Sequence, residues 1–222
     1  MKKILAIMIL MTALATGASA QDYRYEVGAM LGTSGYLGDV NGSNVMRNPG
    51  ISGGFLFRYL IDHRWSLKAN LYTAGISGNS ADEKNQFPDG ATYKFKSQLY
   101  GAGAQMEFNF FNFGVGETYK KLSRISPYLT LGLGLTVAGG DGGNSVAVNL
   151  PMGVGVKYKL KERVNLGLEF TMHKVLGDKI DGLSDLYGVK SSFGKNTDWY
   201  SMITFSVTYE FSKRCRVCHY VE

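Results

Sequence analysis

The sequence ends in a motif with recognised chemistry, Cys215-Arg216-Val217-Cys218-His219. The spacing C-x-x-C-H can indicate covalent attachment of a c-type haem. Only three residues follow His219, which leaves no folded pocket to bury a haem or to supply a second axial ligand. In an oxidising compartment two such cysteines more often form a disulfide. We therefore interpret Cys215 and Cys218 as a local disulfide, with a partner chain, a metal or a redox role as alternatives, and expect no cofactor.

Catalytic candidates are few, because the chain has only three histidines. His173 ends an apolar segment and could act as a base toward lipid at a membrane rim, with Ser191 or Ser192 as the nucleophile. Their spacing does not couple the groups as nucleophilic catalysis requires. Three acidic residues nearby lack the ordered ligand pattern of a calcium loop. They are Asp178, Asp181 and Asp185. We expect a protein that is not an enzyme and that binds no metal.

The elements that carry these residues follow an export signal. Two lysines precede an apolar stretch over residues 4–14, and small residues at 18–20 offer a cleavage site. This pattern predicts that residues 1–20 are a secretory signal peptide. No later segment has the roughly 20 uninterrupted apolar residues that a membrane-spanning helix needs.

The charge of the chain argues against nucleic-acid binding. The 24 basic and 18 acidic residues become 22 and 18 once the two lysines of the signal are removed, which is a net charge of +4. That excess is spread along the chain, without a basic stripe interleaved with aromatic residues. About 200 mature residues correspond to one domain.

Eight segments of the mature chain alternate apolar and polar residues, as β-strands with two different faces do. The expected strands are residues 23–31, 51–59, 65–71, 100–110, 127–135, 148–158, 164–170 and 199–211. One face is apolar, and the other is mostly Gly, Ser, Thr and Asn. A soluble sandwich also alternates, but its water-facing surface would carry more Lys and Glu. We therefore predict an all-β fold, an eight-stranded antiparallel transmembrane barrel of the outer membrane over residues 21–211, followed by a tail over 212–222.

Aromatic residues toward the ends of the apolar face favour a membrane barrel, because lipid interfaces select such girdles. The expected girdle consists of Tyr23, Tyr59, Trp65, Tyr158, Trp199, Tyr209 and Phe211.

The connections between the strands orient this barrel. Long loops are expected over residues 32–50, 77–93, 138–145 and 174–198. The alternate connections are short turns near 61–63 and 161–162, with 112–124 as a longer exception. Bacterial barrels keep their short turns in the periplasm. We therefore expect both chain termini in the periplasm.

Charged residues on the polar face would lie inside the barrel. Four are basic and four are acidic, so they can neutralise one another in an interior that side chains just fill. This set consists of Arg24, Arg58, Lys68, Lys157, Glu26, Glu107, Glu169 and Glu210. We interpret it as a solid polar plug rather than a porin channel, with a gated proton or ion path as the alternative.

Five segments carry a pattern that is recognisable as a set: GYLGDV (35–40), FLFRY (55–59), RISPYL (124–129), NLPMGVGVKY (149–158) and KNTDWYS (195–201). In their order and spacing they resemble the PorG family of outer-membrane proteins. The resemblance runs from about Tyr23 to the cysteine-bearing tail. It implies a component of the type IX secretion system. Such a component would associate with a periplasmic ring that consists of a lipoprotein and a partner protein. No catalytic residues are implied.

A barrel of this size cannot itself be a pore for folded cargo, so the resemblance implies a scaffold or anchor. Its contacts would lie on the periplasmic turns and the tail. The candidates are Asp62, His63, Lys120, Lys121, Lys161, Glu162, Lys213, Arg214 and Arg216. Outer-membrane lipid is the other expected partner, with no nucleic acid and no small-molecule substrate. The alternatives are a general small barrel for membrane integrity or surface adhesion and, more remotely, a lipid-modifying enzyme.

Overall fold

The structure is a computed structural model that describes residues 23–37, 49–79, 94–115, 121–140, 143–176 and 199–213. The expected signal peptide and the two cysteines of the tail lie outside these ranges. No helix within the described ranges is long and apolar enough to cross a membrane.

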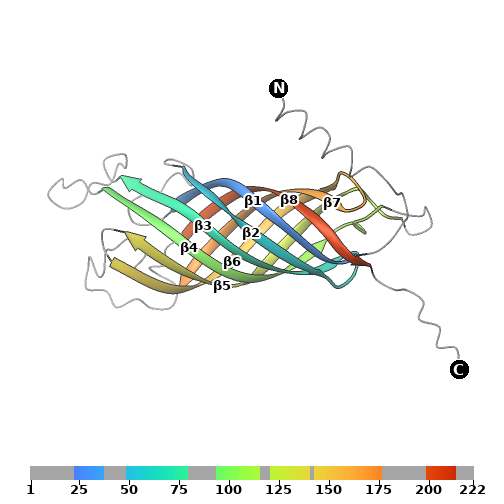
Figure 1. The fold of residues 1–222 in the computed structure, drawn as a ribbon. Coiled ribbons are helices and arrows are strands. Elements are labelled where there is room, and N and C mark those ends of the chain that lie inside the picture. The colour runs from blue at the N-terminus through green and yellow to red at the C-terminus, as the bar shows by residue number, and fades with distance from the viewer. Residues whose placement is uncertain are drawn as a thin grey trace, which may run out of the picture.

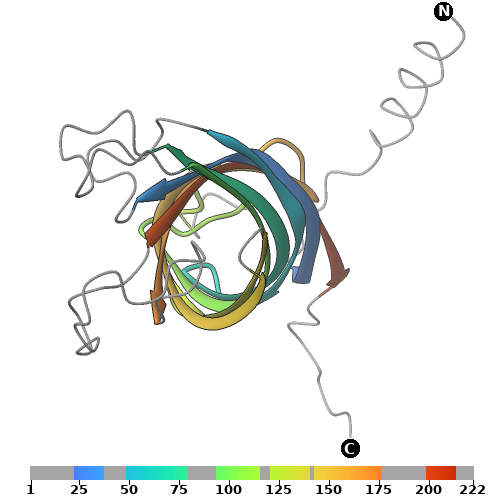
Figure 2. The same cartoon turned by 90° about the vertical axis from the view of Figure 1, so that its left-hand side faces the viewer.

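Eight antiparallel strands form a closed barrel in chain order, and β1 pairs with β8 to complete the ring (Figures 1 and 2). The strands are β1 (Tyr23–Leu37), β2 (Gly50–Leu60), β3 (Trp65–Asn79), β4 (Lys94–Asn109), β5 (Ile125–Gly140), β6 (Gly143–Lys159), β7 (Val164–Leu176) and β8 (Trp199–Lys213). Closure leaves no unpaired edge strand, which is the condition for a sheet to cross a lipid bilayer. The predicted fold class is confirmed.

The alternation in each strand places apolar side chains outside the barrel and polar ones inside. On β5, for example, Leu131 is 61% exposed, whereas the neighbouring Tyr128 and Thr130 are 1% and 4% exposed. A water-soluble fold would bury the leucines instead. An apolar exterior of this extent is stable only in contact with lipid, so the apolar face is the membrane-facing surface.

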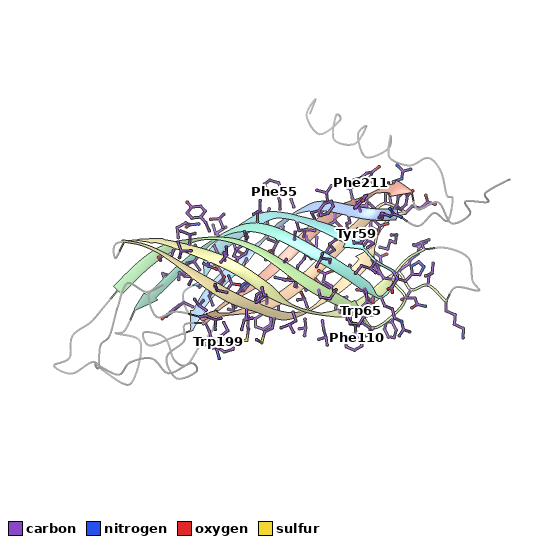
Figure 3. The ribbon with its side chains drawn as sticks, turned by 90° about the horizontal axis from the view of Figure 1, so that it is seen from below. Phe55, Tyr59, Trp65, Phe110, Trp199 and Phe211 are labelled. Carbon is purple, nitrogen blue, oxygen red and sulfur yellow. The ribbon has the colours of Figure 1, made fainter. Side chains whose placement is uncertain are left out.

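The two ends of the barrel differ in their connections. The turn end is the end at which residues 61–64, 110–124 and 160–163 join the strands, and at which β1 begins and β8 ends (Figure 1). The opposite, loop end carries the connections over 38–49, 80–93, 141–142 and 177–198. In Figure 3, Tyr59, Trp65, Phe110 and Phe211 lie toward the turn end, and Trp199 lies toward the loop end. Aromatic residues therefore mark both edges of the apolar surface.

Strand lengths at the loop end differ from the prediction. The pairing of β3 with β4 continues to Asn79 and Lys94, and that of β5 with β6 continues to Gly140 and Gly143. The loop expected over 138–145 is therefore mostly strand. The reason is that backbone hydrogen bonding continues where the apolar alternation, which guided the prediction, has already stopped.

Tyr23 also departs from the prediction, which placed it in the aromatic girdle. Its side chain is only 6% exposed, and its hydroxyl accepts a hydrogen bond of 2.8 Å from Nε of Arg163. The alternation breaks at this point because Ser212, between the paired residues Phe211 and Lys213 of β8, has a left-handed φ of 62°. Such a residue interrupts the regular extended backbone.

Candidate functional site

The interior of the barrel contains a buried network of charges centred on Glu107. Arg58 Nε lies 3.0 Å from Glu107 Oε1, and Lys157 Nζ lies 2.6 Å from Glu107 Oε2. The hydroxyl of Ser66 donates a third hydrogen bond, of 2.9 Å, to the same carboxylate. All four side chains are buried. A buried carboxylate with this many donors is compensated by its neighbours rather than by water.

The network extends to both sides of Glu107. Nη1 of Arg58 lies 2.7 Å from Glu26, which also accepts a hydrogen bond from Thr208. Lys68 lies 3.5 Å from Glu107 and 2.7 Å from Glu169. Residues from β1, β2, β3, β4, β6, β7 and β8 are thereby joined across the lumen. The network therefore spans the interior of the barrel in this layer.

A second ion pair lies nearer the turn end. Nζ of Lys159 lies 2.7 Å from both carboxylate oxygens of Glu210, and the side-chain amide of Asn165 donates to Oε1 at 2.8 Å. Lys159 was missed by the sequence reasoning, which ended the sixth strand at residue 158. The sequence does contain a signal for it. Lys159 lies two residues after Lys157, and alternate residues of one strand share a face, so both lysines are expected inside the barrel.

Arg24 is a correction to the predicted interior set. Its side chain is exposed. Arg24 is the second residue of β1, at the turn end, and lies beside the irregular backbone of Ser212. The other seven residues of that set are buried or, for Glu169, largely buried. With Lys159 in place of Arg24, the described interior contains four cations and four carboxylates, so its formal charges balance.

A layer of aromatic and polar side chains lies on the loop-end side of the charges. The Tyr72 and Tyr200 hydroxyls lie 2.6 Å apart, and that of Tyr200 lies 2.8 Å from Oγ1 of Thr136. The imidazole of His173 stacks on the ring of Tyr200, with centroids 4.4 Å apart. His173 is 2% exposed. It therefore does not lie at the accessible rim where it was expected as a base, and Ser191 and Ser192 lie outside the described residues.

Apolar side chains fill the interior around and beyond this layer. They form one buried cluster whose members come from every strand except β6. The cluster consists of Met30, Tyr36, Leu56, Tyr72, Ala74, Ile76, Leu99, Ala138, Val175, Tyr200 and Met202. An eight-stranded barrel is just wide enough to be filled in this way. In the described residues the lumen is therefore a packed core, charged toward the turn end and apolar toward the loop end.

The connection between β4 and β5 packs against the turn end. The amide of Phe113 donates to the carbonyl of His63 at 3.1 Å, and the amide of Gly114 donates to Ser123 at 3.0 Å. The ammonium of Lys159 lies 5.4 Å from the centre of the Phe113 ring. The described part of this connection therefore contacts both the neighbouring turn and the charged interior.

Five of the predicted contact residues lie at the turn end, where the structure describes their side chains. Asp62 Oδ1 accepts hydrogen bonds from the amides of Arg64 and Trp65 at 2.6 and 2.7 Å, so its carboxylate shapes its own turn. The other four described residues are His63, Lys121, Lys161 and Glu162. Lys213 ends β8, and Lys120, Arg214 and Arg216 lie outside the described residues. Partner binding by these residues stays a prediction.

A closed barrel with an apolar exterior and a filled, charge-balanced interior defines a class of protein, the small outer-membrane β-barrels. Within it, residues 2–220 match the family DUF6089, described as a domain of unknown function, and the chain belongs to this family. No curated protein matches the sequence.

Solved structures with the same architecture are similar to this chain. Neisserial surface protein A aligns with a TM-score of 0.52 and 16% identity, over 84% of this chain and 97% of its own. The outer membrane protein OprG from Pseudomonas aeruginosa aligns with a TM-score of 0.46 and 13% identity, over 87% and 99%. Ail of Yersinia pestis aligns with a TM-score of 0.44 and 12% identity, over 85% and 99%. At these identities only the fold is shared, and of the three alignments that with Neisserial surface protein A has a TM-score above 0.5.

Proposed function

We propose that this chain is a non-conducting, non-enzymatic barrel that anchors a protein secretion machine, the type IX system, in the cell outer membrane. The observation that supports anchoring over transport is the filled interior. Glu107 alone accepts hydrogen bonds from residues of three other strands, β2, β3 and β6. A small barrel without an open lumen works through its two ends and its lipid-facing surface. The assignment to type IX secretion rests on the resemblance of the sequence to the PorG family.

In this proposal the turn end faces the periplasm and contacts a ring of a lipoprotein and its partner. Short turns face the periplasm in bacterial outer-membrane barrels. The turns near Asp62 and Lys161 are held by backbone hydrogen bonds to Trp65 and Val164. A partner would therefore meet a preformed surface and would pay little ordering entropy on binding. The part of the expected tail that follows β8, residues 214–222, is contiguous with this surface along the chain.

The decisive experiment is affinity purification of the full chain from cross-linked outer membranes, with identification of the bound proteins by mass spectrometry. We expect a periplasmic lipoprotein and its ring partner to co-purify, and deletion of residues 214–222 to abolish their recovery. Trimming residues 178–195, at the other end, is the matched control and should leave recovery unchanged. Recovery of the barrel alone, with secretion of sorted cargo intact in a deletion strain, would contradict the proposal.

The second candidate is a general surface barrel that acts through its loop end. The observation that favours it is the extension of β3 and β4 beyond the apolar surface. The lipid-facing apolar positions of β4 end at Tyr100, but the strand itself starts at Lys94. Paired strands that project past the bilayer form a platform for surface contacts. Loss of function on trimming 178–195, with none on deleting 214–222, would favour this candidate.

A further inference from the structure

Each odd-numbered strand starts beside an arginine. Arg64, Arg124 and Arg163 immediately precede the first residues of β3, β5 and β7, namely Trp65, Ile125 and Val164. On β1, Arg24 precedes Tyr25, whose ring contacts Phe57 and Phe211 on the outside of the barrel. All four arginines are exposed. We call them the arginine ring: Arg24, Arg64, Arg124 and Arg163.

Aromatic residues occupy the alternate positions of the same rim. The even-numbered strands end at the turn end, and their outermost lipid-facing positions carry Tyr59 on β2, Phe108 on β4, Tyr158 on β6 and Phe211 on β8. Tyr59 and Phe211 can be followed in Figure 3 toward the turn end of the barrel, where Trp65 and Phe110 also lie. Aromatic side chains of this kind lie at the level of the lipid headgroups. Each arginine therefore lies one residue outside the hydrocarbon boundary.

The arginine ring has no counter-ions among the described residues. No ion pair there includes any of the four, whereas the interior cations are each matched by a carboxylate. Among the described carboxylates close to the ring in sequence, Glu26 is paired with Arg58 in the interior, and that of Asp62 bonds two backbone amides of its own turn. Glu162 and Asp62 are outnumbered by the four arginines together with Lys121 and Lys161. The rim therefore carries an excess of positive charge.

Two of the guanidinium groups are held in place by neutral partners. Arg163 donates from Nε to the Tyr23 hydroxyl at 2.8 Å and from Nη1 to the Tyr209 hydroxyl at 3.0 Å. Arg163 keeps its positive charge, because an arginine guanidinium stays protonated and both of its partners are neutral hydroxyls. Arg64 donates from Nε to Asn112 at 2.9 Å. Both arginines are thus oriented without being neutralised, and N–H groups remain for another acceptor.

We propose that the arginine ring binds the phosphate groups of membrane lipids and thereby sets the depth of the barrel in the bilayer. The guanidinium fork matches two phosphate oxygens, which a lysine ammonium does not. The four arginines occur on alternate strands of a closed ring, so they surround the barrel. An annulus of lipid headgroups fits this distribution better than an acidic protein, which would contact one side.

The two tryptophans of the chain provide the test, because they lie at opposite ends of the barrel. In the full chain with Trp199→Phe, Trp65 reports on the lipid beside the arginine ring. The protein is refolded into phosphatidylcholine vesicles that contain increasing fractions of brominated phosphatidylglycerol. Quenching of Trp65 then gives the relative affinity of the two lipids at this rim. We expect phosphatidylglycerol to be preferred about threefold, and high salt to weaken the preference.

The variant that tests the ring replaces all four arginines by glutamine, and the matched control replaces the rim lysines, Lys121→Gln and Lys161→Gln. We expect the fourfold variant to lose the preference and the lysine control to keep it. A second control uses the Trp65→Phe protein, in which Trp199 reports on the lipid at the opposite end. The lipid preference at Trp199 should be the same whether the four ring positions carry arginine or glutamine. If the fourfold variant fails to insert, the single variants Arg124→Gln and Arg163→Gln should each lower the preference.

Two results would overturn the proposal. One is an unchanged preference in the fourfold variant, or an equal loss in the lysine control. The other is the absence of a preference for phosphatidylglycerol in the parent protein. If cross-linking in outer membranes then also showed a protein that the parent captures and the fourfold variant does not, the ring would be a protein-binding surface. The proposal is independent of the type IX assignment, because it needs only the purified barrel and lipid.

Discussion

Arg58 Nε lies 3.0 Å from the Glu107 carboxylate, although 49 residues separate the two in the chain. They come from β2 and β4, which are not neighbours in the sheet, so the contact crosses the interior of the barrel. Breaking a buried ion pair by removing one partner leaves an uncompensated charge. The stability of the barrel therefore depends on pairs such as this one.

Replacing Glu107 by Gln is expected to lower the free energy of unfolding by about 3–5 kcal/mol, because Arg58 and Lys157 would lose their shared counter-charge. Urea unfolding in lipid vesicles, followed by Trp fluorescence, measures the change. Gln98→Ala is the control, since Gln98 is exposed and bonds only Thr73 among the described side chains. A loss as small as that of the control would mean that water reaches Glu107.

Lys159 and Glu210 are expected to be energetically coupled, because both carboxylate oxygens lie 2.7 Å from the ammonium. In a double-mutant cycle, the variant with both Lys159→Met and Glu210→Gln should lose less free energy of unfolding than the two single variants lose together. We expect the difference to be about 1–3 kcal/mol. Unfolding in urea provides the four free energies. Additive effects would show that the pair contributes no interaction of its own.

The purified barrel is expected to form no steady channel in planar lipid bilayers, because charged and apolar side chains fill its interior. The double variant Tyr72→Ser, Tyr200→Ser removes two rings from the aromatic layer. It tests whether this layer or the charged layer around Glu107 closes the interior. We expect it to remain closed, since the Glu107 network lies in a different layer. Reproducible stepwise currents from the parent protein would show that the lumen opens.

Gly155 is expected to be intolerant of a side chain. A Cβ at this position would lie 2.5 Å from Cζ of Tyr128, whose hydroxyl donates to Glu169 at 2.5 Å. Gly155→Val should therefore displace the tyrosine and lower stability by about 1–3 kcal/mol. The control is Gly53→Ala on the lipid-facing surface, where the nearest atom is the movable end of Leu31 at 3.0 Å. Equal stability of the two variants would contradict this packing.

The predictions made from sequence succeeded where they depended on local pattern. Alternation placed Leu131 outside and Thr130 inside, because successive side chains of a strand point to opposite faces. They failed where the backbone departs from that pattern. Tyr23 is buried and Arg24 exposed beside the left-handed Ser212, and no alternation rule contains that irregularity. The ends of β5 and β6 were also missed, because their glycine-rich pairing carries no apolar signature.

The arginine ring also combines a feature that the sequence shows with one that only the tertiary structure shows. Each arginine, with the lipid-facing residue that follows it, is visible in the sequence, but the sequence does not show that the four surround one rim. That arrangement requires β1 to pair with β8 and close the sheet.

The sequence by itself determined the number of strands and, for most of their length, the two faces of each, since these follow from short-range periodicity and composition. Only the tertiary structure decided which charges meet. The register between strands and the curvature of the closed sheet bring Arg58 to Glu107 and Lys159 to Glu210 across long separations in the chain. No local pattern encodes those distances.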